Sequence, residues 1–242
     1  MKRILICLEA MDYNFIIENK FKTLMSLDPH PAVAFGLGSR PSAAALLGGM
    51  LPVCQIPHCD HRKLRDIWNS PFFMTLLREV TSAQYFLCPN GWILELLLPW
   101  MPQEHRNLNF KWHDDHESCP STELVEYFLK DSKELDNYFA YLHLFESHWP
   151  FYSPEGTGDR VRSTYFLDSL VKRVIEERPE AEIVVVSDHN LPPRITSAAE
   201  DVPAATTMLS FFACNETAYE GKPWSKLVPK IGEVVKKAWW IK

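Results

Sequence analysis

Four short polar segments carry the residue types that could do chemistry, and each follows a run of apolar residues. They are Glu9, the segment 36–42 with Ser39 in it, Glu146-Ser147-His148, and Asp188-His189-Asn190. A serine hydroxyl is a poor nucleophile until a base or a metal ion lowers its pKa. Carboxylates together with an imidazole can hold a divalent ion that does so. These residue types predict attack by a serine on an ester, assisted by a metal ion.

Ser39 is the candidate nucleophile. It stands two residues before Pro41, and proline suits the first turn of a helix. Backbone N–H groups at a helix start favour an anionic oxygen, which suits a phosphate or sulfate ester. Taken alone, Ser39 fits an ordinary helix cap equally well, and His148, which precedes Trp149 and Pro150, fits a packed turn histidine. Both alternatives stay open from the residues alone.

Two acids compete for the metal site near the N-terminus. Glu9 directly follows an apolar run, whereas Asp12 lies three residues further on. Asp12 fits a helix cap better than a ligand. Glu9 alone fits a surface carboxylate, but ligation gains support because Asp188 and His189 follow a second run of the same kind.

The surrounding elements predict where these segments meet. Continuous β-rich runs at 3–8 and 182–187 are typical of strands covered on both faces of a parallel sheet. Weaker strands are predicted at 32–35, 84–88, 138–145 and 206–213, and helices at 14–27, 41–47, 70–79, 121–128 and 164–177. Alternating strands and helices predict an α/β fold, a three-layer αβα sandwich with a mostly parallel central sheet. Ligands bind beyond the carboxyl ends of such strands, where the four polar segments lie.

In chain order these segments resemble the motifs of the alkaline phosphatase superfamily, on its sulfatase and phosphoethanolamine or phosphoglycerol transferase side. The similar segments are the strand that ends in Glu9, Ser39-Arg40-Pro41-Ser42 and the helix after it, Ser147-His148-Trp149-Pro150-Phe151-Tyr152, and Ser187-Asp188-His189. The resemblance implies a phosphoric ester hydrolase or transferase with Ser39 as nucleophile. It also implies that Glu9, Ser39, Asp188 and His189 bind a divalent cation, and that His148 contacts the substrate.

The sequence departs from the family pattern at several positions, and these departures decide which alternative functions remain. Sulfatases that oxidise their nucleophile have a Cys at the position of Ser39 and an Arg at that of Ala43, so a sulfatase is the last of the alternatives. No histidine follows His189, which leaves a second metal site without its usual ligand. The chain also lacks the transmembrane helices of the family's transferases. A degenerate, non-catalytic protein that binds metal or oxyanion is therefore the main alternative.

Composition limits the partners. The 242 residues are 46% hydrophobic and show no dividing linker, which predicts one domain over 1–242 with 54–119 as a possible cap or irregular insertion. A net charge of -6 disfavours nucleic acid, and no apolar run approaches the roughly 18 residues of a membrane span. Six cysteines form no dense framework, which favours reduced thiols and a cytoplasmic protein.

The sequence as a whole predicts a metal-dependent hydrolase or transferase acting on a small phosphate ester, with a sulfate ester as the less favoured substrate. Mixed oxygen and nitrogen ligands favour manganese or zinc, with magnesium or calcium as further options. The sequence does not reveal the alcohol or sugar that carries the ester, or the oligomeric state.

Overall fold

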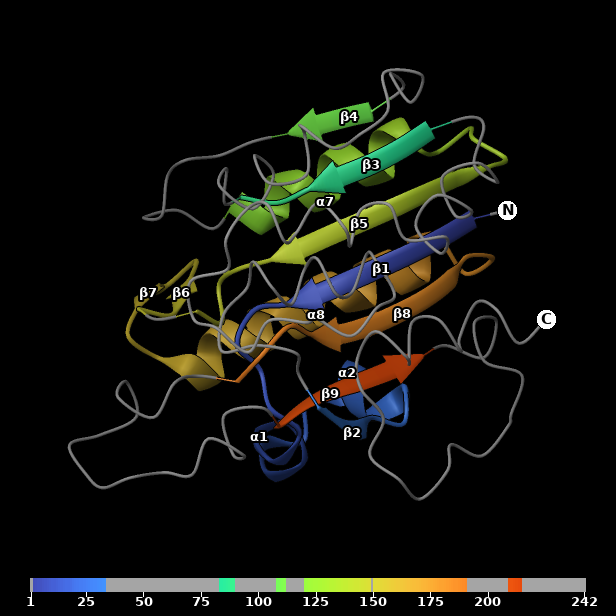
Figure 1. The fold of residues 1–242 in the computed structure, drawn as a ribbon. Coiled ribbons are helices and arrows are strands. Elements are labelled where there is room, and N and C mark those ends of the chain that lie inside the picture. Colours follow the sequence, from blue (N-terminus) through green and yellow to red (C-terminus); the bar gives the residue numbers. More distant parts are fainter. Residues whose placement is uncertain are drawn as a thin grey trace, which may run out of the picture.

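A sheet of seven strands forms the centre of the part of the chain that the structure describes (Figure 1). The structure is a computed structural model, and it describes residues 2–33, 83–89, 108–111, 120–148, 150–190 and 209–214. Across the sheet the order is β2 (His30–Val33), β9 (Leu209–Cys214), β8 (Glu182–Ser187), β1 (Lys2–Leu8), β5 (Tyr138–Leu144), β3 (Ala83–Leu87) and β4 (Leu108–Lys111). The five strands from β8 to β4 run parallel, whereas β9 is antiparallel to both β8 and β2.

The central strands form because their residues are apolar on both faces. β5 is buried at every position, and β1 and β8 are buried at every position after the first. Such burial is expected of strands with layers on both sides. The predicted α/β class with a mostly parallel central sheet is therefore confirmed.

Four described helices accompany the sheet: α1 (Tyr13–Asn19), α2 (Lys22–Ser26), α7 (Pro120–Asp131) and α8 (Arg160–Glu177). The single helix predicted at 14–27 is wrong, because the chain forms α1 and α2 with a break between them. Lys20 ends α1 in the left-handed conformation at φ 53°, and its N–H donates to the Ile16 carbonyl at 2.9 Å. Asp168 on α8 accepts from the backbone N–H groups of Thr23 and Leu24 at 3.1 and 2.8 Å, which fixes the start of α2.

The other predicted elements are recovered with shifted ends. The segments at 32–35, 84–88, 138–145 and 206–213 correspond to β2, β3, β5 and β9, and those at 121–128 and 164–177 correspond to α7 and α8. β4 was not predicted, nor was the hairpin of β6 (Tyr152–Ser153) and β7 (Gly156–Thr157). The helices predicted at 41–47 and 70–79 lie outside the described residues, as does most of 54–119, from which β3 and β4 enter the central sheet.

The two faces of the sheet differ in character. Ile4, Ile6 and Leu8 of β1 pack with helix residues such as Phe128 and Val171 in one apolar core. Figure 1 shows α7 and α8 on that side of the strands. Alternation places Cys7 and Glu9, together with Tyr141 and His143 of β5, on the opposite face. Cys7, Tyr141 and His143 therefore lie on the face away from these helices.

None of the helices in the described ranges is both long enough and apolar enough to cross a membrane. The single-domain organisation over 1–242 stays a prediction.

Candidate metal centre

Glu9, Asp188 and His189 lie together at the carboxyl ends of two neighbouring parallel strands. Leu8 pairs with Ser187 in the register of β1 and β8, so the residues that follow each strand meet. His189 Nε2 lies 3.1 Å from Glu9 Oε1 and 3.3 Å from Asp188 Oδ2. One ligand atom of each residue lies within 4.8 Å of the others, and all three are buried. The structure thus brings together three of the four predicted ligands, and their metal binding stays a prediction.

Backbone groups hold the two strand ends against each other. Asp188 Oδ1 accepts from the N–H groups of Ala10 at 3.0 Å and His189 at 2.9 Å. The Ser187 hydroxyl accepts from the Met11 N–H at 2.8 Å and donates to the His189 carbonyl at 2.9 Å. Ala10 itself is left-handed, with φ 52°, at the tight turn after Glu9. These bonds explain why Glu9 and Asp188 keep a fixed relative position.

One buried oxygen of the site has His189 as a charged neighbour but accepts no hydrogen bond from the described residues. Asp188 Oδ2 is fully buried and lacks a hydrogen bond from any described residue. An unsatisfied buried polar atom costs about 1–3 kcal/mol, so it is rarely left without a role. Its neighbours are a second carboxylate and an imidazole, and a cation would satisfy all three.

The orientation of His189 also fits a metal ligand. Its Nδ1 donates to the Asn190 carbonyl at 2.7 Å, because a carbonyl can only accept. Metal-binding histidines usually donate one ring N–H to such a partner and bind through the other nitrogen. Two carboxylates and one imidazole match a catalytic zinc site, which keeps a further position open. The residues present therefore fit a divalent cation.

The pKa values of the site reflect burial and mutual charge. Burial raises the pKa of Glu9, but hydrogen bonds from His143 and His189 outweigh it and hold that pKa well below its ordinary value. Burial and the charge of Glu9 raise the pKa of Asp188 to about 6. Burial lowers the pKa of His189, but the opposing effect of Asp188 and Glu9 is larger and raises that pKa to about 9. Glu9 therefore carries a negative charge at neutral pH, and His189 is protonated while no cation is bound.

His143 and Tyr141 are part of the site but were not predicted. His143 Nε2 lies 2.6 Å from Glu9 Oε2, and its Nδ1 lies 2.9 Å from the Tyr141 hydroxyl. All three side chains are buried. The signal was present in β5, whose sequence YFAYLHL places a histidine and a tyrosine two residues apart in an otherwise apolar strand. A buried imidazole requires polar partners, and Glu9, at the end of the neighbouring strand β1, is one of them for His143.

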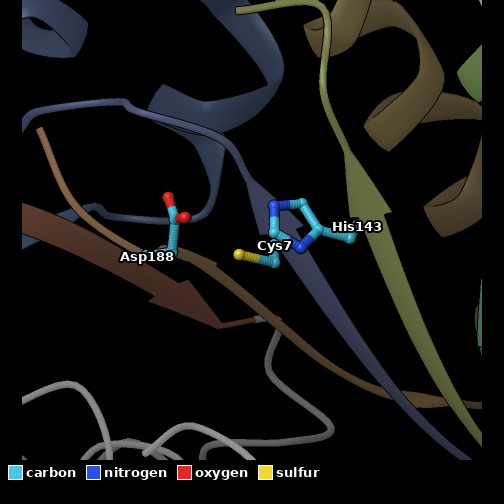
Figure 2. A group of neighbouring side chains, drawn as sticks. All are labelled: Cys7, His143 and Asp188. Atoms are coloured by element: carbon cyan, nitrogen blue, oxygen red, sulfur yellow. The ribbon is translucent and has the colours of Figure 1, made fainter. Parts of the chain in front are cut away.

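A second group of potential ligands shares Asp188 (Figure 2). Figure 2 shows Cys7 on β1, His143 on β5 and Asp188 after β8 gathered in one region, and their ligand atoms lie within 4.8 Å of one another. Burial raises the pKa of the Cys7 thiol to about 11. Because only the thiolate binds metals well, Cys7 is a weaker candidate than the carboxylates.

The turn after β5 connects His148 to the site indirectly. The Ser147 hydroxyl donates to the Glu9 carbonyl, and the His148 ring stacks on Phe145 with centroids 4.7 Å apart. The role of His148 in substrate contact stays a prediction. Glu146 instead accepts from the Ser121 N–H at 2.9 Å and from the Ser121 hydroxyl, at the start of α7.

Two other sequence predictions concern Asp12 and Ser39, and the structure describes the first of them. Asp12 is confirmed as the N-cap of α1, where its carboxylate accepts from the Phe15 N–H at 2.9 Å. Ser39, the predicted nucleophile and fourth ligand, lies outside the described residues.

The fold defines the class to which the chain is similar, that of the alkaline phosphatase superfamily. A Vibrio parahaemolyticus structure of that superfamily is 15% identical to this chain, with a TM-score of 0.59. The match covers 87% of this chain and 59% of the Vibrio chain. The Listeria monocytogenes lipoteichoic acid synthase LtaP is 13% identical, with a TM-score of 0.61 and coverages of 100% and 72%. The C-terminal periplasmic domain of Escherichia coli EcEptC, in complex with zinc, is 13% identical, with a TM-score of 0.54 and coverages of 98% and 81%.

These likenesses confirm the predicted resemblance at the level of the fold. No family model matches the chain, and no curated protein matches its sequence. The chain spans 59% of the length of the Vibrio structure.

The predicted cytoplasmic location is wrong. Several of the similar structures are periplasmic domains, which points away from the cytoplasm. The inference failed because it relied on the cysteines. Cys7 and Cys88 are buried free thiols, and burial protects a thiol in any compartment, so they carry no information on location.

Proposed function

We propose that the protein is a metal-dependent hydrolase or transferase of phosphate esters that uses Ser39 as its nucleophile. The observation that carries the proposal is the convergence of Glu9, Asp188 and His189, with Asp188 Oδ2 buried and without a hydrogen bond among the described residues. Glu9, Asp188, His189 and the Ser39 hydroxyl would hold the cation. Manganese or zinc suits this mixture of oxygen and nitrogen ligands.

A bound divalent cation supplies Lewis acidity, which lowers the pKa of a hydroxyl and offsets charge on the transferring group. The Ser39 hydroxyl would lose its proton to water, and its oxygen would form a bond to phosphorus while the bond from phosphorus to the leaving alcohol breaks. His148 donates a proton to the leaving oxygen. Water, or an acceptor alcohol in a transferase, then takes the phosphoryl group from Ser39 and restores the hydroxyl.

Turnover of aryl phosphate, phosphodiester and sulfate substrates with added manganese or zinc tests the proposal. We expect Ser39→Ala to lower kcat by at least about 10³-fold, as loss of a nucleophile does. Ser169→Ala, on the exposed side of α8, is the matched control and should turn over like the wild type. Wild-type turnover by Ser39→Ala would remove Ser39 from the mechanism.

A non-catalytic binding protein is the second candidate, because no histidine follows His189 to complete a second metal site. It predicts binding of zinc or phosphate in calorimetry with no turnover of any substrate in the screen. A sulfatase ranks last, since it requires an aldehyde at Ser39 that intact mass would reveal.

A further inference from the structure

Two imidazoles bind the same carboxylate, one at each oxygen. His189 Nε2 lies 3.1 Å from Glu9 Oε1, and His143 Nε2 lies 2.6 Å from Glu9 Oε2. The two rings differ in what their other nitrogen does. His189 Nδ1 donates to the Asn190 carbonyl, whereas His143 Nδ1 faces the Tyr141 hydroxyl at 2.9 Å.

This difference indicates that His189 can bind a cation, whereas His143 can only hold the Glu9 carboxylate. His189 Nε2 faces both carboxylates, so it can exchange its proton for a cation and keep the bond from Nδ1. His143 has neither nitrogen available, since Nε2 donates to Glu9 and Nδ1 is occupied by Tyr141. A cation on His143 would have to break one of these two buried hydrogen bonds.

We propose that His143, held by Tyr141, is a positioning residue that fixes the Glu9 carboxylate so that Oε1 points at the cation. This inference rests on the proposed metal site. Ligating carboxylates are commonly held by such hydrogen bonds, and loss of the partner typically costs about 10–100-fold in metal affinity.

The sheet makes this support rigid. Cys7 pairs with His143 in the register of β1 and β5, and the Glu9 N–H donates to the Leu144 carbonyl at 3.0 Å. β5 therefore holds both the backbone and the side chain of Glu9. Tyr141 lies two residues before His143 on the same face, which prevents the ring from rotating.

Zinc affinity, measured by competition with a chromophoric chelator, tests the role of His143. We expect His143→Leu to weaken zinc binding by about 10–100-fold. His143→Gln keeps an N–H donor near the Nε2 position, so it should recover most of that loss. Thermal unfolding of the metal-free proteins is measured in parallel, and an affinity change without a matching change in Tm separates positioning from folding.

Three further variants keep the test decisive if His143→Leu does not fold. Tyr141→Phe should weaken zinc binding by about tenfold, the low end of such effects. Tyr85→Phe, the same change in the same sheet, removes a hydroxyl that donates to Asp131 at 2.6 Å and should leave zinc binding unchanged. Cys7→Ser keeps a small polar side chain beside His143 and removes the thiol, so its zinc affinity should stay near that of the wild type.

The outcomes distinguish the inference from the proposed function. Wild-type protein that binds neither zinc nor manganese overturns the proposed metal site, and the inference with it. Wild-type affinity in His143→Leu or Tyr141→Phe overturns the inference alone. A loss in Cys7→Ser as large as that in His143→Leu also overturns it, because the cation would then lie on Cys7 and His143.

Discussion

Asp188 divides its two oxygens between the backbone and the centre of the site. Oδ1 accepts from Ala10 and His189, while Oδ2 is buried without a hydrogen bond from any residue in the described ranges. An asparagine can retain the first set of bonds through its amide oxygen, but it brings an N–H group to the position of Oδ2. The chemistry of Asp188 can therefore be removed while its structural bonds are kept.

Asp188→Asn should lower zinc affinity by at least about tenfold, because an amide nitrogen does not replace an anionic ligand. The Tm of the metal-free protein should fall as well, because an N–H group then faces His189 Nε2, so zinc affinity is compared at a temperature where both proteins are folded. Zinc competition and thermal unfolding measure the two effects. Asp28→Asn, at a carboxylate whose side chain is 90% exposed, is the control. Unchanged zinc affinity in Asp188→Asn would contradict its place in the site.

Glu146 gives a pH-dependent prediction away from the proposed ligands. Burial raises the pKa of Glu146 above its ordinary value of 4.5, although hydrogen bonds from Ser121 oppose the shift. The folded protein thus binds this proton more tightly than the unfolded chain does. The resulting stability is present below the unfolded pKa and is lost as pH rises through the folded pKa.

Glu146→Gln removes this titration and keeps both contacts, since an amide can accept from the Ser121 N–H and donate to its hydroxyl. The free energy of unfolding of the wild type, relative to the variant, should therefore fall as pH rises from about 4 to 8. Urea denaturation of both proteins across that range measures the difference. A constant difference, or one that grows with pH, would contradict the assignment.

The sequence could predict which polar side chains meet at strand ends, while their metal binding stays a prediction. Glu9, Asp188 and His189 each follow an apolar run, and the edge of a parallel sheet had to bring them together. His143 was missed because it lies inside a strand, where an apolar pattern gives no sign of polar partners. Only the pairing of β5 with β1 reveals that its ring reaches Glu9.

At the scale of elements, contacts between residues distant in sequence fix helix boundaries that local sequence patterns do not predict. The apolar runs of β1 and β8 were predicted almost to the residue because burial on both faces demands them. The break between α1 and α2 was not predicted, since Asp168 caps α2 from more than 140 residues away along the chain.

Asp168→Ala should therefore destabilise the protein by about 1–3 kcal/mol, because two backbone N–H groups of α2 lose their buried acceptor. The free energy of unfolding in urea measures this loss. Glu176→Ala, at an exposed position within α8, is the control and should stay within about 0.5 kcal/mol of the wild type. Equal stability of Asp168→Ala and the control would show that α2 does not depend on this cap.

At the scale of the whole molecule, a cation held by β1 and β8 would join residues separated by most of the chain. A ligand that binds only the folded state stabilises it by mass action, by about 2.7 kcal/mol at 100 times its Kd. Zinc should therefore raise the Tm of the wild type, and a chelator should reverse the rise. Asp188→Asn should show a much smaller rise, whereas an equal rise in both proteins would place the zinc elsewhere.

The fold of the whole molecule is recognisable without sequence similarity. Structures 13–15% identical share it, while no family model matches. Layered α/β packing depends on the pattern of apolar residues, which many sequences satisfy, whereas the site depends on a few residues at strand ends. The prediction of the fold was therefore safer than that of the location, which rested on the number and spacing of the cysteines.

Anomalous diffraction at the zinc edge, from crystals grown with zinc, tests the central claim most directly. The account predicts one peak within about 2.0–2.2 Å of a Glu9 oxygen, an Asp188 oxygen and His189 Nε2. A peak bonded to Cys7 and His143 instead, or no peak between the ends of β1 and β8, would contradict it.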